Sequence, residues 1–114
     1  MTDFNSNLGL EPGSEPDSIH LETRDEHLIA ADTVHFAVLT TMAEVAAAGA
    51  VGAPVVPAVV NVNLLSRARA GTLTAHGRLI KRGRTLAVAD GEVRQGDRLV
   101  AKATITFAVL GNPK

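Results

Sequence analysis

The sequence predicts an α+β domain in which one antiparallel sheet of five to six strands wraps around a single central helix. Residues 33–66 carry one formally charged side chain, Glu44. A helix in such a run has no polar face, so other elements must surround it. After Pro57 the apolar residues recur with the period of two that is typical of strands. Short glycine-containing turns separate these strands, and such turns join antiparallel neighbours.

Length and composition favour one globular domain without a membrane anchor. The chain has 114 residues, a length sufficient for one hydrophobic core. Its composition, 46% hydrophobic and 20% charged, is typical of a globular protein. It has no cysteine, which excludes disulfides, a thiolate nucleophile and a zinc ribbon. Glycines and prolines interrupt the uncharged segment 45–60, whereas a membrane span needs about 20 unbroken apolar residues. The N-terminus lacks the basic and apolar regions of a signal peptide, so we expect a cytoplasmic protein.

The net charge of −1 conceals an uneven distribution along the chain. Residues 1–44 contain nine acids and one base, whereas residues 45–114 contain three acids and ten bases. The basic part could bind an anionic partner, or the two parts could complement one another within the fold or across a dimer. We do not expect nucleic acid as the partner, because no aromatic residue lies among the bases to stack on nucleotides.

The sequence pattern in the first half of the chain predicts a flexible N-terminal leader, a strand and the central helix. Residues 1–17 lack periodicity and are expected to form a flexible leader, followed by one folded domain over residues 18–114. Residues 18–24 alternate and predict a first strand. The helix is expected from Val34 to about Ala48, with Asp32 or Thr33 as its N-cap. Two candidate stop residues follow it, Gly49 and Gly52.

Four further strands are expected over residues 58–66, 71–80, 85–94 and 98–110. The last has the clearest alternation, and one face of it is wholly apolar. That face carries Leu99, Ala101, Ala103, Ile105, Phe107 and Val109.

Glu44 is the first candidate for chemistry. An ionised carboxylate in an apolar helix is costly unless it is paired, hydrogen-bonded or faces a water-filled cleft. One interpretation is a glutamate at a helix edge or in a dimer contact, and the other is a base or nucleophile at the floor of a pocket. His35, nine residues earlier, lies where the helix is expected to start.

The segment HFAVLTTMAE, His35 to Glu44, resembles the motif that opens the central helix in hotdog-fold acyl-CoA thioesterases of the PaaI-like and 4-hydroxybenzoyl-CoA thioesterase-like groups. There a His-Gly-Gly sequence is followed seven residues later by Asp or Glu. The strand pattern of residues 59–110 is also similar, so that the resemblance covers about residues 19–110. It implies a hotdog fold and hydrolysis of an acyl-CoA thioester. It also implies a homodimer or homotetramer in which each site uses both chains.

The resemblance assigns three residues to catalysis, and neither a metal nor a cofactor is required. Glu44 matches the catalytic acid, which acts as general base on water or as nucleophile on the thioester carbonyl. His35 matches the histidine beside the substrate, and the backbone N–H of Phe36 matches the oxyanion donor. The positive end of a helix is suited to stabilising charge that develops on a thioester oxygen.

The resemblance further implies basic residues at strand ends and turns that bind coenzyme A across a subunit interface. Arginine pairs well with phosphate oxygens, although each such residue could equally be a solvated turn charge. Two asparagines could face the acyl or pantetheine channel. The candidates for substrate and CoA binding are Asn61, Asn63, Arg67, Arg69, Lys81, Arg82 and Arg84.

Several positions depart from the family pattern. Phe36 and Ala37 stand where the motif has its two glycines, and Asp32 stands where the family often has a further glycine. Ile29 replaces an amide residue before the histidine, and Ala48 replaces a hydroxyl residue after the acid. These changes leave open a hotdog module that binds acyl-CoA or another hydrophobic ligand without hydrolysing it. A hotdog dehydratase or hydratase is a third alternative, but its histidine and acid have other spacings.

Overall fold

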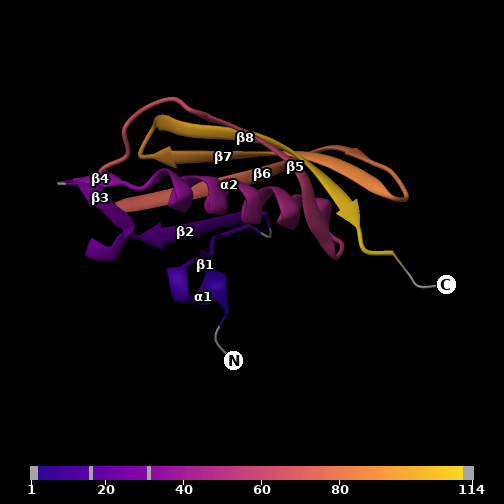
Figure 1. Cartoon of the computed structure of the whole chain (residues 1–114), viewed down its shortest axis with the longest axis horizontal. Helices are drawn as coiled ribbons and strands as arrows, with labels where there is room; N and C mark the ends of the chain where they lie inside the picture. The colour runs from indigo at the N-terminus through magenta and orange to yellow at the C-terminus, as the bar shows by residue number, and fades with distance from the viewer. Residues whose placement is uncertain (1–2, 16, 31, 112–114) are drawn as a thin grey trace.

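The computed structural model describes residues 3–15, 17–30 and 32–111. Two helices, one 3-10 turn and eight strands follow one another in that part of the chain (Figure 1). In chain order they are α1 (Phe4–Leu8), β1 (Glu11–Pro12), β2 (Ser18–Glu22), the 3-10 turn η1 (Asp25–His27), β3 (Leu28–Ala30), β4 (Thr33–Val34), α2 (Phe36–Val51), β5 (Val55–Leu64), β6 (Thr72–Arg82), β7 (Leu86–Gln95) and β8 (Arg98–Val109).

Six of the strands form one antiparallel sheet in the order β1-β2-β6-β7-β8-β5. Strands β6, β7 and β8 form a meander of hairpins, whereas β5 pairs with β8 and lies at the edge. Figure 1 shows α2 beneath β6, β7 and β8, while β2 lies on the other side of the helix in this view. The predicted α+β hotdog fold, a sheet of five to six strands wrapped around one central helix, is therefore confirmed.

Two glycines let the backbone of α2 approach the sheet directly. A Cβ atom on Gly91 of β7 would lie 2.7 Å from the carbonyl carbon of Ala43. A Cβ atom on Gly77 of β6 would lie 3.0 Å from the backbone nitrogen of Ala47. The carbonyl oxygens of Ala43 and Ala46 would lie closer still, at separations that real Cβ atoms essentially never show, so only glycine permits this packing. The alanines of the helix serve the same close approach.

The ends of α2 differ in part from the sequence prediction. His35 is the N-cap, and its Nδ1 atom accepts a hydrogen bond from the Ala37 N–H at 2.9 Å. The prediction of Asp32 or Thr33 was wrong because Thr33 belongs to β4, which pairs with β3. At the other end Gly52 adopts the left-handed conformation (φ 73°) that terminates a helix. No helix among the described residues is long and apolar enough to cross a membrane.

A bulge in β8 changes the expected alternation at its start. Val93 pairs with Ala101 but Arg94 pairs with Leu99, so Val100 is an extra residue in the ladder. Val100 is therefore fully buried, whereas Leu99 is only partly buried. The expected face was wrong at these two positions and correct at Ala101, Ala103, Ile105 and Phe107, all fully buried.

Residues 3–15, within the expected leader, contain α1 and β1. The Arg24 side chain donates a hydrogen bond to the carbonyl oxygen of Asn7 at 2.7 Å. The Nε2 atom of His27 lies 2.8 Å from the carbonyl oxygen of Leu8. These contacts fix α1 beside the turn after β2, and they explain why His27 is buried. The flexibility of residues 1–17 and the boundary at residue 18 stay predictions.

Candidate active site

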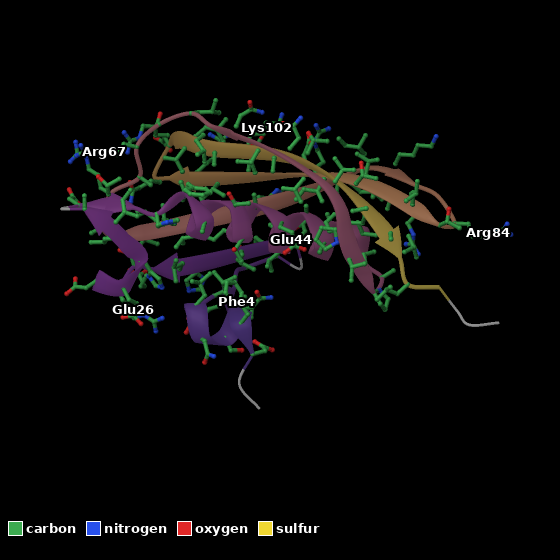
Figure 2. The ribbon with its side chains drawn as sticks, viewed as in Figure 1. Phe4, Glu26, Glu44, Arg67, Arg84 and Lys102 are labelled. Carbon is green, nitrogen blue, oxygen red and sulfur yellow. The ribbon has the colours of Figure 1, made fainter. Side chains whose placement is uncertain are left out.

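Glu44 lies midway along α2, on the stripe of the helix that faces away from the sheet (Figure 2). The side chain is half-buried, and burial raises the pKa of its carboxyl above the ordinary value of 4.5. Among the described residues no ion pair or hydrogen bond engages this carboxylate. The carboxylate is therefore neither fully solvated nor neutralised by a partner, which is the state expected of a group that meets a ligand.

The N-terminus of α2 presents an aromatic pair. The rings of His35 and Phe36 stack with their centroids 4.8 Å apart and an interplanar angle of 25°. Because Nδ1 of His35 accepts the Ala37 N–H, the imidazole is tied to the first turn of the helix. The Phe36 N–H is the first of the helix, and no described residue accepts a hydrogen bond from it. It remains available at the positive end of the helix.

A groove of about 390 Å³ opens beside this helix end. Its walls come from the segment before the helix, the first turns of α2, the end of β5 and the loop that follows β5. They are mostly apolar. The lining residues are Ile29, Thr33, Val34, Phe36, Leu39, Leu64, Leu65, Ser66, Arg67 and Ala68.

Asp32 positions the loop that forms one wall of the groove. Its backbone is left-handed (φ 57°), a conformation that Asp tolerates better than most residues other than Gly. Its carboxylate accepts hydrogen bonds from the Ala70 N–H at 2.8 Å and from Arg69 Nη1 at 3.1 Å. These hydrogen bonds lower the pKa of the Asp32 carboxyl. The sequence presents Asp32 only as a candidate N-cap and as a departure from the family pattern, and it gives no sign of this role in the loop.

The five basic candidates fall into two groups at opposite ends of α2. Arg67 and Arg69 lie at its N-terminal end, and Figure 2 places Arg84 beyond the other end. Arg82 Nη1 donates to the carbonyl oxygen of Val51 at 3.2 Å, so the hairpin between β6 and β7 packs on the helix C-terminus. A helix of 16 residues is about 24 Å long. One chain therefore does not bring the two groups together.

The hairpin group also borders a second cleft. This cleft has a volume of about 680 Å³ and includes Arg82 and Arg84 in its walls. Lys81 belongs to the same hairpin and is exposed. Both the cleft and the N-terminal groove thus combine apolar surface with arginine.

The asparagines of β5 lie on the outer face of the sheet. Asn61 pairs with Thr104 and Asn63 pairs with Lys102, and directly paired residues share a face. Lys102 approaches Asp90 and Glu92 on that face, whereas its neighbours Ala101 and Ala103 are buried against the helix. The structure therefore does not bring Asn61 and Asn63 together with Glu44 in one chain.

Strand β5 exposes apolar side chains along an edge that no other described strand covers. Two of its side chains on the face toward the helix are open to solvent, because Val60 is 46% and Leu64 50% exposed. Val56 and Val59 are also exposed, on the outer face. A long apolar edge strand is a template for pairing with another chain.

Among the described residues one group could hold a metal ion, namely Glu15, Asp17 and His76. The Nε2 atom of His76 lies 2.9 Å from a carboxylate oxygen of Glu15 and 3.3 Å from one of Asp17. The side chain of His76 points to the outer face, because the neighbouring Gly77 meets the helix. The sheet therefore separates this group from α2, and it is no part of the candidate active site.

Comparison with known proteins identifies the family. The sequence profile described as the thioesterase superfamily matches residues 31–102, well over half of the chain. The chain belongs to this superfamily. A search of curated protein sequences finds no significant match.

Solved structures of similar fold cover nearly the whole chain. A phenylacetic acid degradation-related protein from Ralstonia eutropha is 28% identical with a TM-score of 0.77, over 92% of this chain and 88% of that one. A mutant of the phenylacetic acid degradation protein PaaI from Thermus thermophilus is 27% identical with a TM-score of 0.83, over 93% and 97%. A Streptococcus mutans protein, solved bound to acetyl-CoA, is 25% identical with a TM-score of 0.80, over 99% and 96%. The likeness to PaaI-like hotdog proteins confirms the resemblance seen in the sequence.

Proposed function

We propose that this protein hydrolyses an acyl-CoA thioester, with Glu44 as general base and the Phe36 N–H as oxyanion donor. The observation that carries the proposal is the carboxylate of Glu44, which has no partner among the described residues and whose pKa is raised by burial. Such a base accepts a proton from water closer to neutral pH than an ordinary glutamate does. Membership of the thioesterase superfamily supports the reaction class, and the acetyl-CoA of the Streptococcus mutans protein supports CoA thioesters as ligands.

The reaction proceeds through a tetrahedral intermediate. Glu44 takes a proton from water while the water oxygen attacks the thioester carbonyl carbon. The negative charge that develops on the carbonyl oxygen is stabilised by the Phe36 N–H and the helix dipole. The intermediate then expels the CoA thiolate, which receives the proton from Glu44. Attack by the Glu44 carboxylate itself, followed by hydrolysis of an anhydride, is the alternative within the same site.

The spacing of the two groups supports a site shared between two chains. Glu44 follows Phe36 by eight residues, which corresponds to about 12 Å along the helix axis. Donor and base must converge on one carbonyl group through contacts of about 3 Å each. We therefore infer that the Phe36 N–H of one protomer works with Glu44 of a second copy.

The exposed edge of β5 supports the required homodimer. Antiparallel pairing of two β5 edges about a two-fold axis perpendicular to the sheet would cover the apolar side chains of that strand. The same axis sets two α2 helices antiparallel, and Phe36 then meets Glu44 if the helices cross near residue 40. A tetramer, as a pair of such dimers, stays a further possibility for the same protomer.

The dimer also supports a role for both basic groups in binding coenzyme A. In an antiparallel pair, the hairpin with Lys81, Arg82 and Arg84 of one copy lies at the end where the other copy presents Arg67 and Arg69. Arginines suit the phosphates of coenzyme A at such a boundary. Asn61 and Asn63 have a weaker claim, because they share the outer face of the sheet with Lys102.

Binding of an acyl-CoA without hydrolysis is the second candidate function. It is favoured by the Phe36 side chain, which is 56% exposed at the helix end where the family has glycine. A single experiment separates the two candidates. Purified protein is incubated with a panel of acyl-CoAs and a thiol-reactive dye, which reports only released CoA because the chain has no cysteine.

Turnover that Glu44→Gln abolishes supports the hydrolase. Calorimetric binding of a non-hydrolysable acyl-CoA thioether without turnover supports the binding module, and absence of both contradicts the two candidates. A cytoplasmic location stays part of the proposal, and cell fractionation tests it.

A further inference from the structure

We propose that Glu15, Asp17 and His76 bind one divalent cation, with Zn²⁺ as the best match, and that this ion fastens the segment before β2 to β6. The site is separate from the proposed hydrolysis, because the His76 side chain lies on the face of the sheet opposite α2. The inference follows from the spacing of three ligand atoms, from the backbone that holds them and from the charges around them.

The three side chains bring one nitrogen and two carboxylate oxygens together. Nε2 of His76 lies 2.9 Å from a carboxylate oxygen of Glu15 and 3.3 Å from one of Asp17, and all three atoms lie within 4.8 Å of one another. Zinc binds histidine nitrogen and carboxylate oxygen at about 2.0–2.2 Å, so two ligand atoms of a tetrahedral zinc ion lie about 3.4 Å apart. Small rotations of these solvent-accessible side chains therefore suffice to place an ion between them.

Backbone contacts hold the two carboxylates beside His76. The Gly77 N–H donates a hydrogen bond to the carbonyl oxygen of Asp17 at 2.8 Å, which ties Asp17 to the residue after His76. Ser18 pairs directly with His76 in the ladder of β2 and β6, and its Oγ accepts a hydrogen bond from the Glu15 N–H at 3.1 Å. The ligands are thus preorganised by a strand pair and the turn that precedes it, which reduces the entropy lost when an ion binds.

The two carboxylates have no permanently charged partner in the described part of the chain. There, His76 is the only side chain that forms an ion pair with Glu15 or Asp17. By contrast, Asp90 and Glu92 on the next strand each lie beside an arginine and a lysine. Histidine changes its charge near neutral pH, so it is not a permanent counter-ion. A divalent cation would neutralise both carboxylates and would use the imidazole in its uncharged form.

The mixed ligand set favours zinc over magnesium and calcium. Imidazole suits zinc and its neighbours among the transition metals, whereas magnesium and calcium prefer oxygen ligands. Three protein ligands leave one tetrahedral position for water. That position is accessible, because the cluster borders a cleft of about 430 Å³ with Glu15 and His76 in its walls. Bound zinc would join residues 15 and 17 to β6, so its binding free energy would stabilise this junction.

The experiment titrates Zn²⁺ into chelator-treated protein without an affinity tag and measures binding by calorimetry at pH 7.5. Glu15→Gln removes the charge of one ligand, and His76→Ala removes the imidazole. His20→Ala is the matched control, because His20 lies on the same face of the sheet and contacts a single carboxylate, that of Glu11 at 3.3 Å. Circular dichroism establishes that the variants are folded, and thermal melting with and without zinc is a second measure of binding.

Wild type and His20→Ala are expected to bind one zinc ion per chain and to melt at a higher temperature when zinc is present. Glu15→Gln and His76→Ala are expected to bind zinc at least tenfold more weakly, because even outer-shell partners of a metal contribute about 10–100-fold in affinity. Absence of zinc binding by wild type, or equal zinc affinity of all four proteins, would overturn the inference. Magnesium bound as tightly as zinc would overturn the assignment of the ion. Release of CoA is measured separately, so failure of this site leaves the proposed hydrolysis standing.

Discussion

Replacing Phe36 with proline is expected to remove the proposed oxyanion donor while α2 stays folded. Proline has no N–H, and Phe36 is the first residue of the helix, where proline is well accepted. His35 before it has φ −62° and ψ 138°, the extended conformation that a residue preceding proline prefers. The lost N–H has no acceptor among the described residues, so the helix loses no internal hydrogen bond.

The size of the effect follows from the role of the N–H. Removing one oxyanion-hole donor costs about 10²–10³ in kcat, or about 2.7–4 kcal/mol. Phe36→Pro also removes the benzyl group, so Phe36→Ala is the control that removes the ring and keeps the N–H. We expect kcat of Phe36→Pro to be about 100-fold or more below that of Phe36→Ala. The melting temperatures of the two variants should agree within about 5 °C.

The assay is steady-state release of CoA, followed with a thiol-reactive dye, on an acyl-CoA that wild type hydrolyses. Circular dichroism and thermal melting establish that both variants are folded. Equal kcat values for folded Phe36→Pro and Phe36→Ala would refute the assignment of this N–H as the oxyanion donor. A proline variant that unfolds would refute the structural part of the reasoning, namely the free N–H at the first position of the helix.

The remaining predictions concern Glu44, the packing of α2 and the dimer. As a base whose pKa is raised above 4.5, Glu44 makes kcat/KM fall as pH drops through that raised value, and a pH–rate profile checks this. Because the folded state holds the Glu44 proton more tightly, Glu44→Gln should melt higher than wild type at pH 7, and the difference should vanish below pH 4.5. Gly91→Ala should lower the free energy of unfolding by about 1–3 kcal/mol or more, because the added methyl group meets the Ala43 backbone. Gly111→Ala has open space at its Cβ and should change the free energy of unfolding little. Urea unfolding of both variants measures the difference. Thr40→Cys should give a crosslinked dimer with a short bis-maleimide, whereas Ser6→Cys on α1 should not. Denaturing gel electrophoresis of both treated variants measures the crosslinking. Equal crosslinking of the two variants would contradict the proposed helix crossing.

The sequence was sufficient for the fold because its periodicities are strong. An apolar stretch followed by two candidate stop residues, Gly49 and Gly52, left a buried helix as the consistent interpretation, and alternation with a period of two marked each long strand. Sequence periodicity could not reveal the bulge at Val100, because the extra residue is determined by how β7 and β8 pair. It also did not identify His35 as the N-cap, because Thr33 belongs to a strand whose pairing with β3 is not visible in the sequence.

The sequence singles out Glu44, His35 and Phe36 as candidates, whose roles stay predictions, but it does not place the substrate-binding candidates relative to them. A lone acid in an apolar segment is conspicuous in a sequence, and a motif of ten residues fixes its spacing. Which end of the helix a distant arginine reaches depends on strand order, so Arg67 and Arg84 could not be separated beforehand. The contribution of Asp32 depends on a left-handed backbone and on contacts with residues 69–70, which no local pattern reveals.

Mixing two inactive variants, Glu44→Gln and Phe36→Pro, tests the site shared between protomers most directly. A mixed dimer has one site that combines the intact N–H of the first variant with the intact carboxylate of the second. Random exchange makes about half of the dimers mixed, with one of two sites complete and both of its groups wild type, so the account predicts recovery of about a quarter of the wild-type activity. If exchange is verified and the mixture stays as inactive as the separate variants, Glu44 and the Phe36 N–H do not act across the interface.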